Sequence, residues 1–134
     1  MRTMLLVVCA FLLYQPATAN AVCPKDCTVV VTMAAGCGSG IKVAPDPLFV
    51  APGKDPVDIE FVFQGEGWAF ADDGIAIHLA GSEFPKGPGS SKSRKFKHKN
   101  NGPKVFKYDV NLIDARPGPT QGQRCSLDPT IIDQ

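Results

Sequence analysis

Apolar and polar residues alternate along several segments with a period of two, which is typical of half-buried β-strands. The clearest segment is 57–63, VDIEFVF, in which every odd position is apolar. In 104–113, KVFKYDVNLI, the even positions are apolar from Phe106 onward, and odd positions such as Asn111 should face solvent. The β-branched run at 28–33, TVVVTM, also favours a strand.

A further alternating segment, 74–80 (GIAIHLA), should place Leu79 on one face with Ile75 and Ile77, opposite His78. Shorter extended pieces are expected at 41–44, 48–50 and 127–132, separated by turns rich in Gly and Pro. Asn101-Gly102 is typical of a two-residue hairpin turn. No stretch shows the spacing of an amphipathic helix. The pattern therefore predicts an all-β chain folded as a single antiparallel β-sandwich or barrel.

The first 21 residues have the pattern of a secretory signal peptide. Arg2 precedes the apolar run 5–13, LLVVCAFLL, and Pro16 and small residues follow it. A membrane helix needs about 20 apolar residues, so this run is too short to span a bilayer, and an uncleaved anchor is the alternative. We expect cleavage after Ala21, a domain at 22–134 with no transmembrane segment, and a periplasmic or secreted product.

Four cysteines remain after residue 21, and an even number in an exported protein predicts two disulfides. They are Cys23, Cys27, Cys37 and Cys125. Four cysteines allow three pairings, and the sequence does not choose among them. The alternatives are a metal site or free thiols. The Cys23-x3-Cys27 spacing lacks the tight knuckle of paired Cys-x-x-Cys motifs, and no His lies nearby.

The overall charge is balanced, with 14 Lys and Arg against 13 Asp and Glu in 134 residues. This balance argues against a dedicated nucleic-acid binder, in which one sign usually dominates. The charges are nevertheless segregated along the chain. Residues 46–83 contain eight acidic residues and one basic residue, Lys54, whereas 86–107 contain eight basic residues and no acidic one.

The basic residues are densest in 93–99, SRKFKHK, where alternation places Lys95, Lys97 and Lys99 on one face. Together with Lys92, Arg94 and Trp68 they are the candidate binding residues. Such a surface would meet an acidic protein, an anionic glycan or an anionic envelope surface. The alternative is a solvated face that protects an edge strand from aggregation.

Candidate catalytic residues are few. The carboxylates near Trp68 are Glu66, Asp72 and Asp73. They could ligate a calcium ion. They could also act as general acid and base in a small hydrolase, with Trp68 as the platform on which a sugar stacks. The structural alternative is that Trp68 fills the core or caps one end of the sandwich. The stretch 87–92, GPGSSK, lacks the ending of a phosphate-binding loop and no helix pattern follows it. We therefore predict that the protein is not an enzyme.

Several turn and core segments resemble the cupredoxin-like sandwich. They are 47–50 (PLFV), Pro52-Gly53, 57–61 (VDIEF), 67–70 (GWAF), 107–110 (KYDV) and 127–132 (LDPTII). In that family a Pro-Gly turn leads into a strand, and a late Tyr-bearing strand runs toward the metal loop. The chain also resembles small exported bacterial proteins with a Leu-Asp-Pro tail. The resemblance implies a Greek-key β-sandwich, cupredoxin-like or immunoglobulin-like, tied here by disulfides.

The copper ligands of that family do not carry over. Blue copper needs two His, a Cys thiolate and usually a weak axial Met. After Cys125 the chain continues SLDPTIIDQ, without His or Met. His78 and His98, the only histidines, remain as candidate metal ligands, with Cys125 as a third only if its thiol were free.

We therefore expect no cofactor, with copper as the alternative. The sequence predicts an exported, non-catalytic binding or interaction module that uses its basic face. The alternative is a copper-binding or redox protein with a non-standard site.

Overall fold

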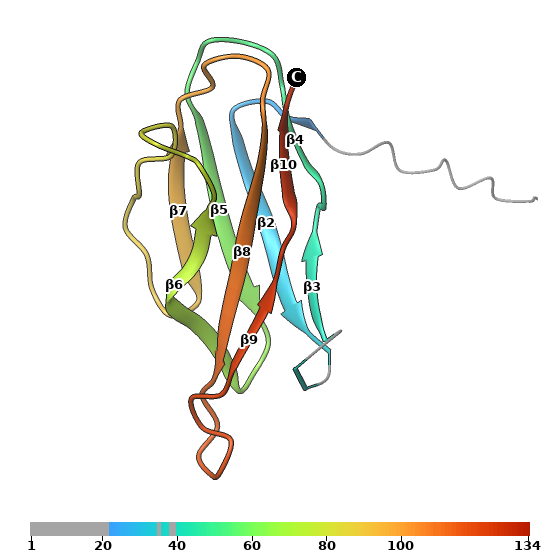
Figure 1. The fold of residues 1–134 in the computed structure, drawn as a ribbon, viewed down its shortest axis with the longest axis vertical. Coiled ribbons are helices and arrows are strands. Elements are labelled where there is room, and N and C mark those ends of the chain that lie inside the picture. The colour runs from blue at the N-terminus through green and yellow to red at the C-terminus, as the bar shows by residue number, and fades with distance from the viewer. Residues whose placement is uncertain (1–21, 35, 38–39) are drawn as a thin grey trace, which may run out of the picture.

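The alternating segments form ten β-strands in the computed structural model, which describes residues 22–34, 36–37 and 40–134 (Figure 1). No helix occurs among these residues, so the prediction of an all-β chain is confirmed. The predicted signal peptide and its cleavage site lie outside the described residues. The strands are β1 (Val22–Cys23), β2 (Asp26–Met33), β3 (Ile41–Ala44), β4 (Leu48–Val50), β5 (Val57–Gln64), β6 (Trp68–Ile77), β7 (Ser93–His98), β8 (Val105–Asp114), β9 (Arg124–Leu127) and β10 (Thr130–Asp133).

The strands form two sheets. One has the order β1-β4-β10-β8-β6, with β9 also pairing with β8, and the other has the order β3-β2-β5-β7. Both sheets are mixed, because β1 with β4, β4 with β10, and β2 with β5 are parallel pairs. The expectation of purely antiparallel pairing is wrong in these three places. Alternation along one strand says nothing about the direction of its neighbour, which depends on where the connecting chain crosses between sheets.

The core lies between the two sheets and is built from the inward positions that the alternation predicts. Phe61 of β5 is fully buried. Its ring centroid lies 5.9 Å from that of Phe96 in the same sheet and 5.3 Å from that of Tyr108 in the opposite sheet. A fully buried side chain of this size contributes about 2–3 kcal/mol to stability. The contacts therefore hold β5, β7 and β8 together across the interior.

Two residues depart from the predicted alternation. Leu79 is fully exposed, because β6 ends at Ile77 and Leu79 adopts a left-handed backbone conformation with φ of 52°. Asn111 is buried although its position in β8 was expected to face solvent. Its side-chain amide donates to the carbonyl of Asp73 (2.9 Å), and its side-chain oxygen accepts from Ser126 (2.7 Å). Hydrogen bonds to β6 and β9 therefore satisfy the buried side-chain amide of Asn111, which the alternation of β8 alone had predicted to face solvent.

Asn101-Gly102 does not form a hairpin. The strands before and after it, β7 and β8, belong to different sheets, so this segment crosses from one sheet to the other. Pro103 follows directly and has no N–H to donate, which disfavours a hairpin ladder.

The free edge of β7 is covered by residues 83–90. Lys97 donates its backbone N–H to the carbonyl of Pro85 (3.0 Å), and Gly87 donates to the carbonyl of Lys95 (2.8 Å). Pro85 and Pro88 cannot donate from their nitrogens, so this covering segment does not offer a regular new edge. The Pro- and Gly-rich loop therefore shields the free edge of β7 from pairing with another chain.

Two disulfides connect the sheets, which confirms the prediction of two bridges and decides their pairing. Cys23 pairs with Cys27 and Cys37 pairs with Cys125, with Cα–Cα distances of 5.5 and 5.2 Å. The first joins β1 to β2, and the second joins the β2–β3 connection to β9. Structural disulfides persist in oxidising compartments, so these bridges indicate a non-cytoplasmic protein. The described part of the chain contains no helix long and apolar enough to cross a bilayer.

Candidate functional site

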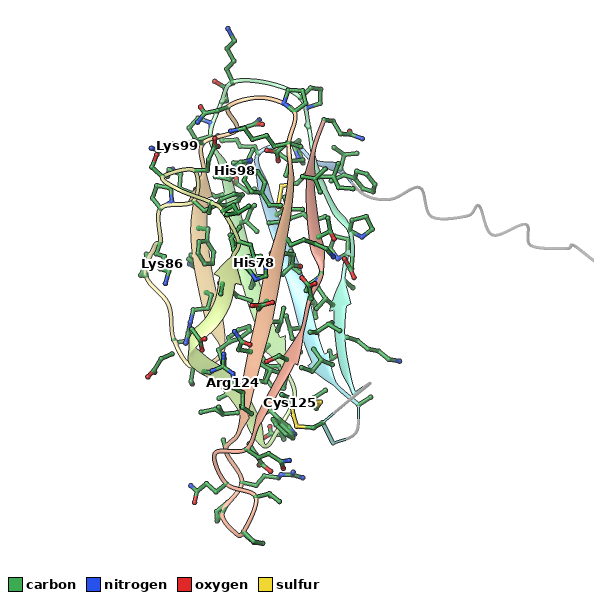
Figure 2. All side chains as sticks on the ribbon, viewed as in Figure 1. His78, Lys86, His98, Lys99, Arg124 and Cys125 are labelled. Carbon is green, nitrogen blue, oxygen red and sulfur yellow. A yellow bond between two sulfur atoms is a disulfide. The ribbon has the colours of Figure 1, made fainter. Side chains whose placement is uncertain are left out.

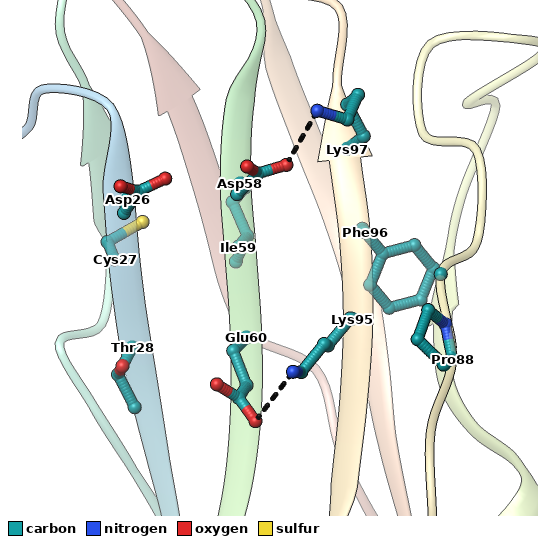
Figure 3. Close-up of a pocket in the computed structure, with 11 residues that line it drawn as sticks. Asp26, Cys27, Thr28, Asp58, Ile59, Glu60, Pro88, Lys95, Phe96 and Lys97 are labelled. Atoms are coloured by element: carbon teal, nitrogen blue, oxygen red, sulfur yellow. Dashed lines mark ion pairs between the residues drawn. The ribbon is translucent and has the colours of Figure 1, made fainter.

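A groove of about 550 Å³ lies on the outer face of the four-stranded sheet (Figure 3). Side chains of β2, β5 and β7 form its floor, and Gly87 and Pro88 of the edge-covering segment form one wall. The floor is regular because the outward positions of three paired strands lie side by side. The floor of the groove is therefore defined by sheet positions, and only its wall at Gly87 and Pro88 comes from a loop.

Strand register arranges the floor in two rows of polar side chains. Asp26, Asp58 and Lys97 form one row, and Thr28, Glu60 and Lys95 form the next. The Nζ atom of Lys97 lies 3.2 Å from the Asp58 carboxylate, and that of Lys95 lies 3.9 Å from the Glu60 carboxylate (Figure 3).

These ion pairs are solvent-exposed, so each stabilises the fold by less than about 1 kcal/mol. The groove thus presents three carboxylates and two ammonium groups, and they can exchange their present partners for a ligand with only a small loss of free energy. A ligand that offers both acidic and donor groups would match this floor.

The basic stripe predicted at Lys95, Lys97 and Lys99 does point outward, but the structure adds acidic neighbours to two of its members. Asp58 and Glu60 were visible in the sequence only as the polar face of 57–63. Nothing in the sequence places that face beside β7. Lys99 follows the end of β7, away from the groove floor, and no acidic side chain pairs with it among the described residues (Figure 2).

Lys92 and Arg94, the other predicted basic residues, lie where the two sheets approach each other. Lys92 donates to the carbonyls of Trp68 (2.6 Å) and Gly65 (3.0 Å), and its ammonium lies 4.5 Å from the centroid of the Phe63 ring. Arg94 donates to the carbonyl of Ala71 (2.8 Å). Their charges are therefore engaged by the protein's own backbone.

Trp68 is only 5% exposed, and its ring is covered by the Arg116 guanidinium at 5.4 Å from the ring centroid. Asp114 holds Arg116 through two side-chain contacts of 2.9 and 2.7 Å and also accepts from Thr120 (2.8 Å). The hydrogen bonds from Arg116 hold the pKa of Asp114 well below its usual range. Trp68 presents no open face on which a sugar could stack.

Replacing Arg116 with Ala should uncover Trp68. Because Trp68 is the only tryptophan, we expect a red shift of the intrinsic fluorescence and stronger quenching by acrylamide, with the fold retained. Arg124→Ala is the matched control, since Arg124 pairs with Asp73 (2.8 and 2.6 Å) and does not contact the ring. An unchanged Arg116→Ala spectrum would contradict the covering role.

The acidic residues near Trp68 do not converge on a common site. Asp73 is engaged by Arg124, whose hydrogen bond lowers the pKa of that carboxyl. Asp72 is exposed on β6, and Glu66 is exposed in the turn before it. Within the described residues they form no metal-holding group of three. The calcium and hydrolase hypotheses therefore gain no support from the geometry.

The two histidines lie in different environments, and neither lies with Cys125 (Figure 2). His98 is fully buried, with Nε2 2.9 Å from both carboxylate oxygens of Asp133 and its ring stacked on Phe84 at 4.2 Å. His78 is exposed, and its Nε2 lies 2.8 Å from the Asp109 carboxylate. Cys125 is oxidised to a disulfide and offers no thiolate, so a thiolate-copper site would require its reduction.

No protein-family model matches the chain, and neither does any curated protein. The geometry of the described sites therefore carries the functional inference.

Proposed function

We propose that this protein is an exported, non-catalytic binding module, and that it captures its partner in the groove over β2, β5 and β7. The observation that carries the proposal is the pair of charged rows on the groove floor. Each row carries both acidic and basic side chains. Charges of both signs fixed on a rigid sheet select a partner by its charge pattern and orientation, and contribute less to raw affinity.

The partner that fits best is an extended polypeptide segment of mixed charge. Its acidic groups would meet Lys95 and Lys97, while its amide and basic groups would meet Asp58 and Glu60. A pure polyanion fits less well, because three carboxylates line the same floor and repel it. Anionic glycans and anionic lipid surfaces remain the rival partners.

Export is proposed on two grounds, the signal-peptide pattern of residues 1–21 and the two disulfides. Periplasmic and secreted locations both fit these grounds.

The binding test uses peptides of mixed charge selected on the immobilised, oxidised protein and measured by fluorescence anisotropy. The double variant Lys95→Glu/Lys97→Glu should weaken binding at least tenfold, because it places five carboxylates on the floor. The matched control is Lys42→Glu/Lys54→Glu, which makes the same charge change on β3 and in the β4–β5 connection.

A second variant separates recognition from folding. The fourfold variant Asp58→Lys/Glu60→Lys/Lys95→Glu/Lys97→Glu exchanges the signs of both ion pairs and keeps the net charge and the cross-strand pairing. It should fold normally and still lose the selected peptides. Equal binding by this variant and the wild type would exclude the groove as the site. Tighter binding of heparin or of phosphatidylglycerol vesicles than of any peptide would overturn the polypeptide assignment.

A further inference from the structure

Three neighbouring elements of the six-stranded sheet bring His78, Asp109 and Asp128 together on its outer face. His78 directly follows β6, Asp109 lies within β8, and Asp128 directly follows β9. β6 pairs with one edge of β8, and β9 pairs with the other. The three residues therefore come from segments far apart in the sequence but adjacent in the sheet, on a face other than that of the groove.

The backbone holds the two flanking residues against β8. The N–H of His78 donates to the carbonyl of Lys107 (2.8 Å), and the N–H of Tyr108 donates to the carbonyl of Pro129 (3.1 Å), next to Asp128. Pro129 has no N–H, so β9 and β10 are separate strands and Asp128 lies in the break between them. Side chains attached to a rigid sheet in this way are better positioned than side chains on free loops.

The side-chain atoms of these three residues are close enough to share one ion. One ligand atom from each residue lies within 4.8 Å of the other two, and Nε2 of His78 lies 2.8 Å from the Asp109 carboxylate. Around a tetrahedral ion with bonds of about 2.1 Å, ligand atoms are roughly 3.4 Å apart. His78 and Asp128 are exposed, so small side-chain rotations can reach this spacing without disturbing the sheet.

We propose that His78, Asp109 and Asp128 form a binding site for a divalent transition-metal ion, with Zn²⁺ as the best-matched probe. An imidazole nitrogen favours zinc over the hard cations calcium and magnesium, which prefer oxygen ligands. Two carboxylates supply the charge that balances a dication. Three protein ligands leave a tetrahedral ion one open position for water or for a group on a partner.

Lys107 competes with the ion for this site. Its Nζ atom lies 3.8 Å from the Asp128 carboxylate and also donates to the carbonyl of Asp128 (3.3 Å). The lysine therefore provides part of the positive charge that the metal would bring. Replacing Lys107 with Met should tighten zinc binding roughly two- to fivefold, because an exposed ion pair of this kind has a small free energy. An unchanged or weakened zinc affinity in Lys107→Met would contradict the competing role of Lys107.

The test is isothermal titration of the oxidised, EDTA-treated protein with ZnCl₂. We expect one zinc per chain, and binding weakened at least tenfold in His78→Ala and in Asp128→Asn. Asp55→Asn is the matched control, because it removes an exposed carboxylate in the β4–β5 connection, outside both proposed sites, and should leave zinc binding unchanged. Circular dichroism and thermal unfolding of each variant establish that the sheet is intact.

Titration with CoCl₂ gives a second readout, since visible absorption bands report an imidazole-carboxylate coordination sphere. His98 is buried, so His78 is the exposed histidine among the described residues, and its removal should abolish the bands. Absence of saturable zinc binding, or equal zinc binding by wild type and His78→Ala, overturns the proposal. Calcium binding of equal strength in wild type and His78→Ala would show a carboxylate site for hard cations and would also overturn it. The groove proposal is unaffected by any of these results.

Discussion

Replacing Cys37 and Cys125 together with serine should lower the free energy of unfolding by about 4–5 kcal/mol. The two residues are 88 positions apart, and in the chain-entropy model a crosslink that closes so long a loop strongly restricts the unfolded chain. The bridge also joins the β2–β3 connection to β9, so its loss frees the two sheets from each other at that end. For a domain of this size the loss is a large part of the total stability.

The second disulfide provides the matched control. Cys23 and Cys27 are four positions apart, so serine at both should lower the free energy of unfolding by only about 2 kcal/mol in the same model. Equilibrium unfolding in guanidinium chloride, with linear extrapolation to water, measures both losses. If the two double variants lost equal free energy of unfolding, the stabilisation by the Cys37–Cys125 bridge would not come from closing a long loop.

Replacing Asp133 with Ala should lower the free energy of unfolding by about 3–5 kcal/mol, because it leaves His98 buried with no partner. The side chains of both residues are fully buried, and Nδ1 of His98 already has no hydrogen-bond partner among the described residues. Phe84 stacks on the ring at 4.2 Å and Phe106 meets it edge-on, so water cannot easily replace the lost carboxylate.

The exposed His78–Asp109 pair is the natural comparison for the buried one. Its side chains are 46% and 38% exposed, so Asp109→Ala should lower the free energy of unfolding by less than about 1 kcal/mol. The double variant His98→Leu/Asp133→Ala should be more stable than Asp133→Ala alone, because no unpaired polar ring remains. Denaturant unfolding of the four proteins measures these differences. A small loss in Asp133→Ala would contradict the proposed dependence of His98 on its carboxylate.

The inward and outward sides of β5 and β7 were predictable from the sequence. In 57–63 the odd positions are buried, and in 93–98 the lysines face outward while Phe96 and His98 are buried. The pattern worked there because both strands have a buried face and a solvated face, which is the condition for a period of two.

The prediction was wrong where the backbone departs from a regular strand. Pairing between β6 and β8 shifts register between Phe70 and Ile75, and β6 then ends before Leu79. After this shift the predicted alternation holds for Ile75 and Ile77, which both pack on the core. It fails at Leu79 because that residue lies beyond the strand in a left-handed backbone conformation. Asn111 was misplaced for a related reason, since its burial depends on Ser126 and Asp73 from neighbouring strands.

The sequence by itself determined the strand character of the chain, the inward side of its most regular strands and the even number of cysteines available for bridging. Only the tertiary structure decided which cysteines pair, and that Asp58 and Glu60 lie beside Lys97 and Lys95. It alone brought His78, Asp109 and Asp128 onto one face. The physical reason is that a period of two is a local property of one strand. The neighbours of a strand are selected by long-range packing and by the paths of the connecting chain, which leave no periodic signal in the sequence.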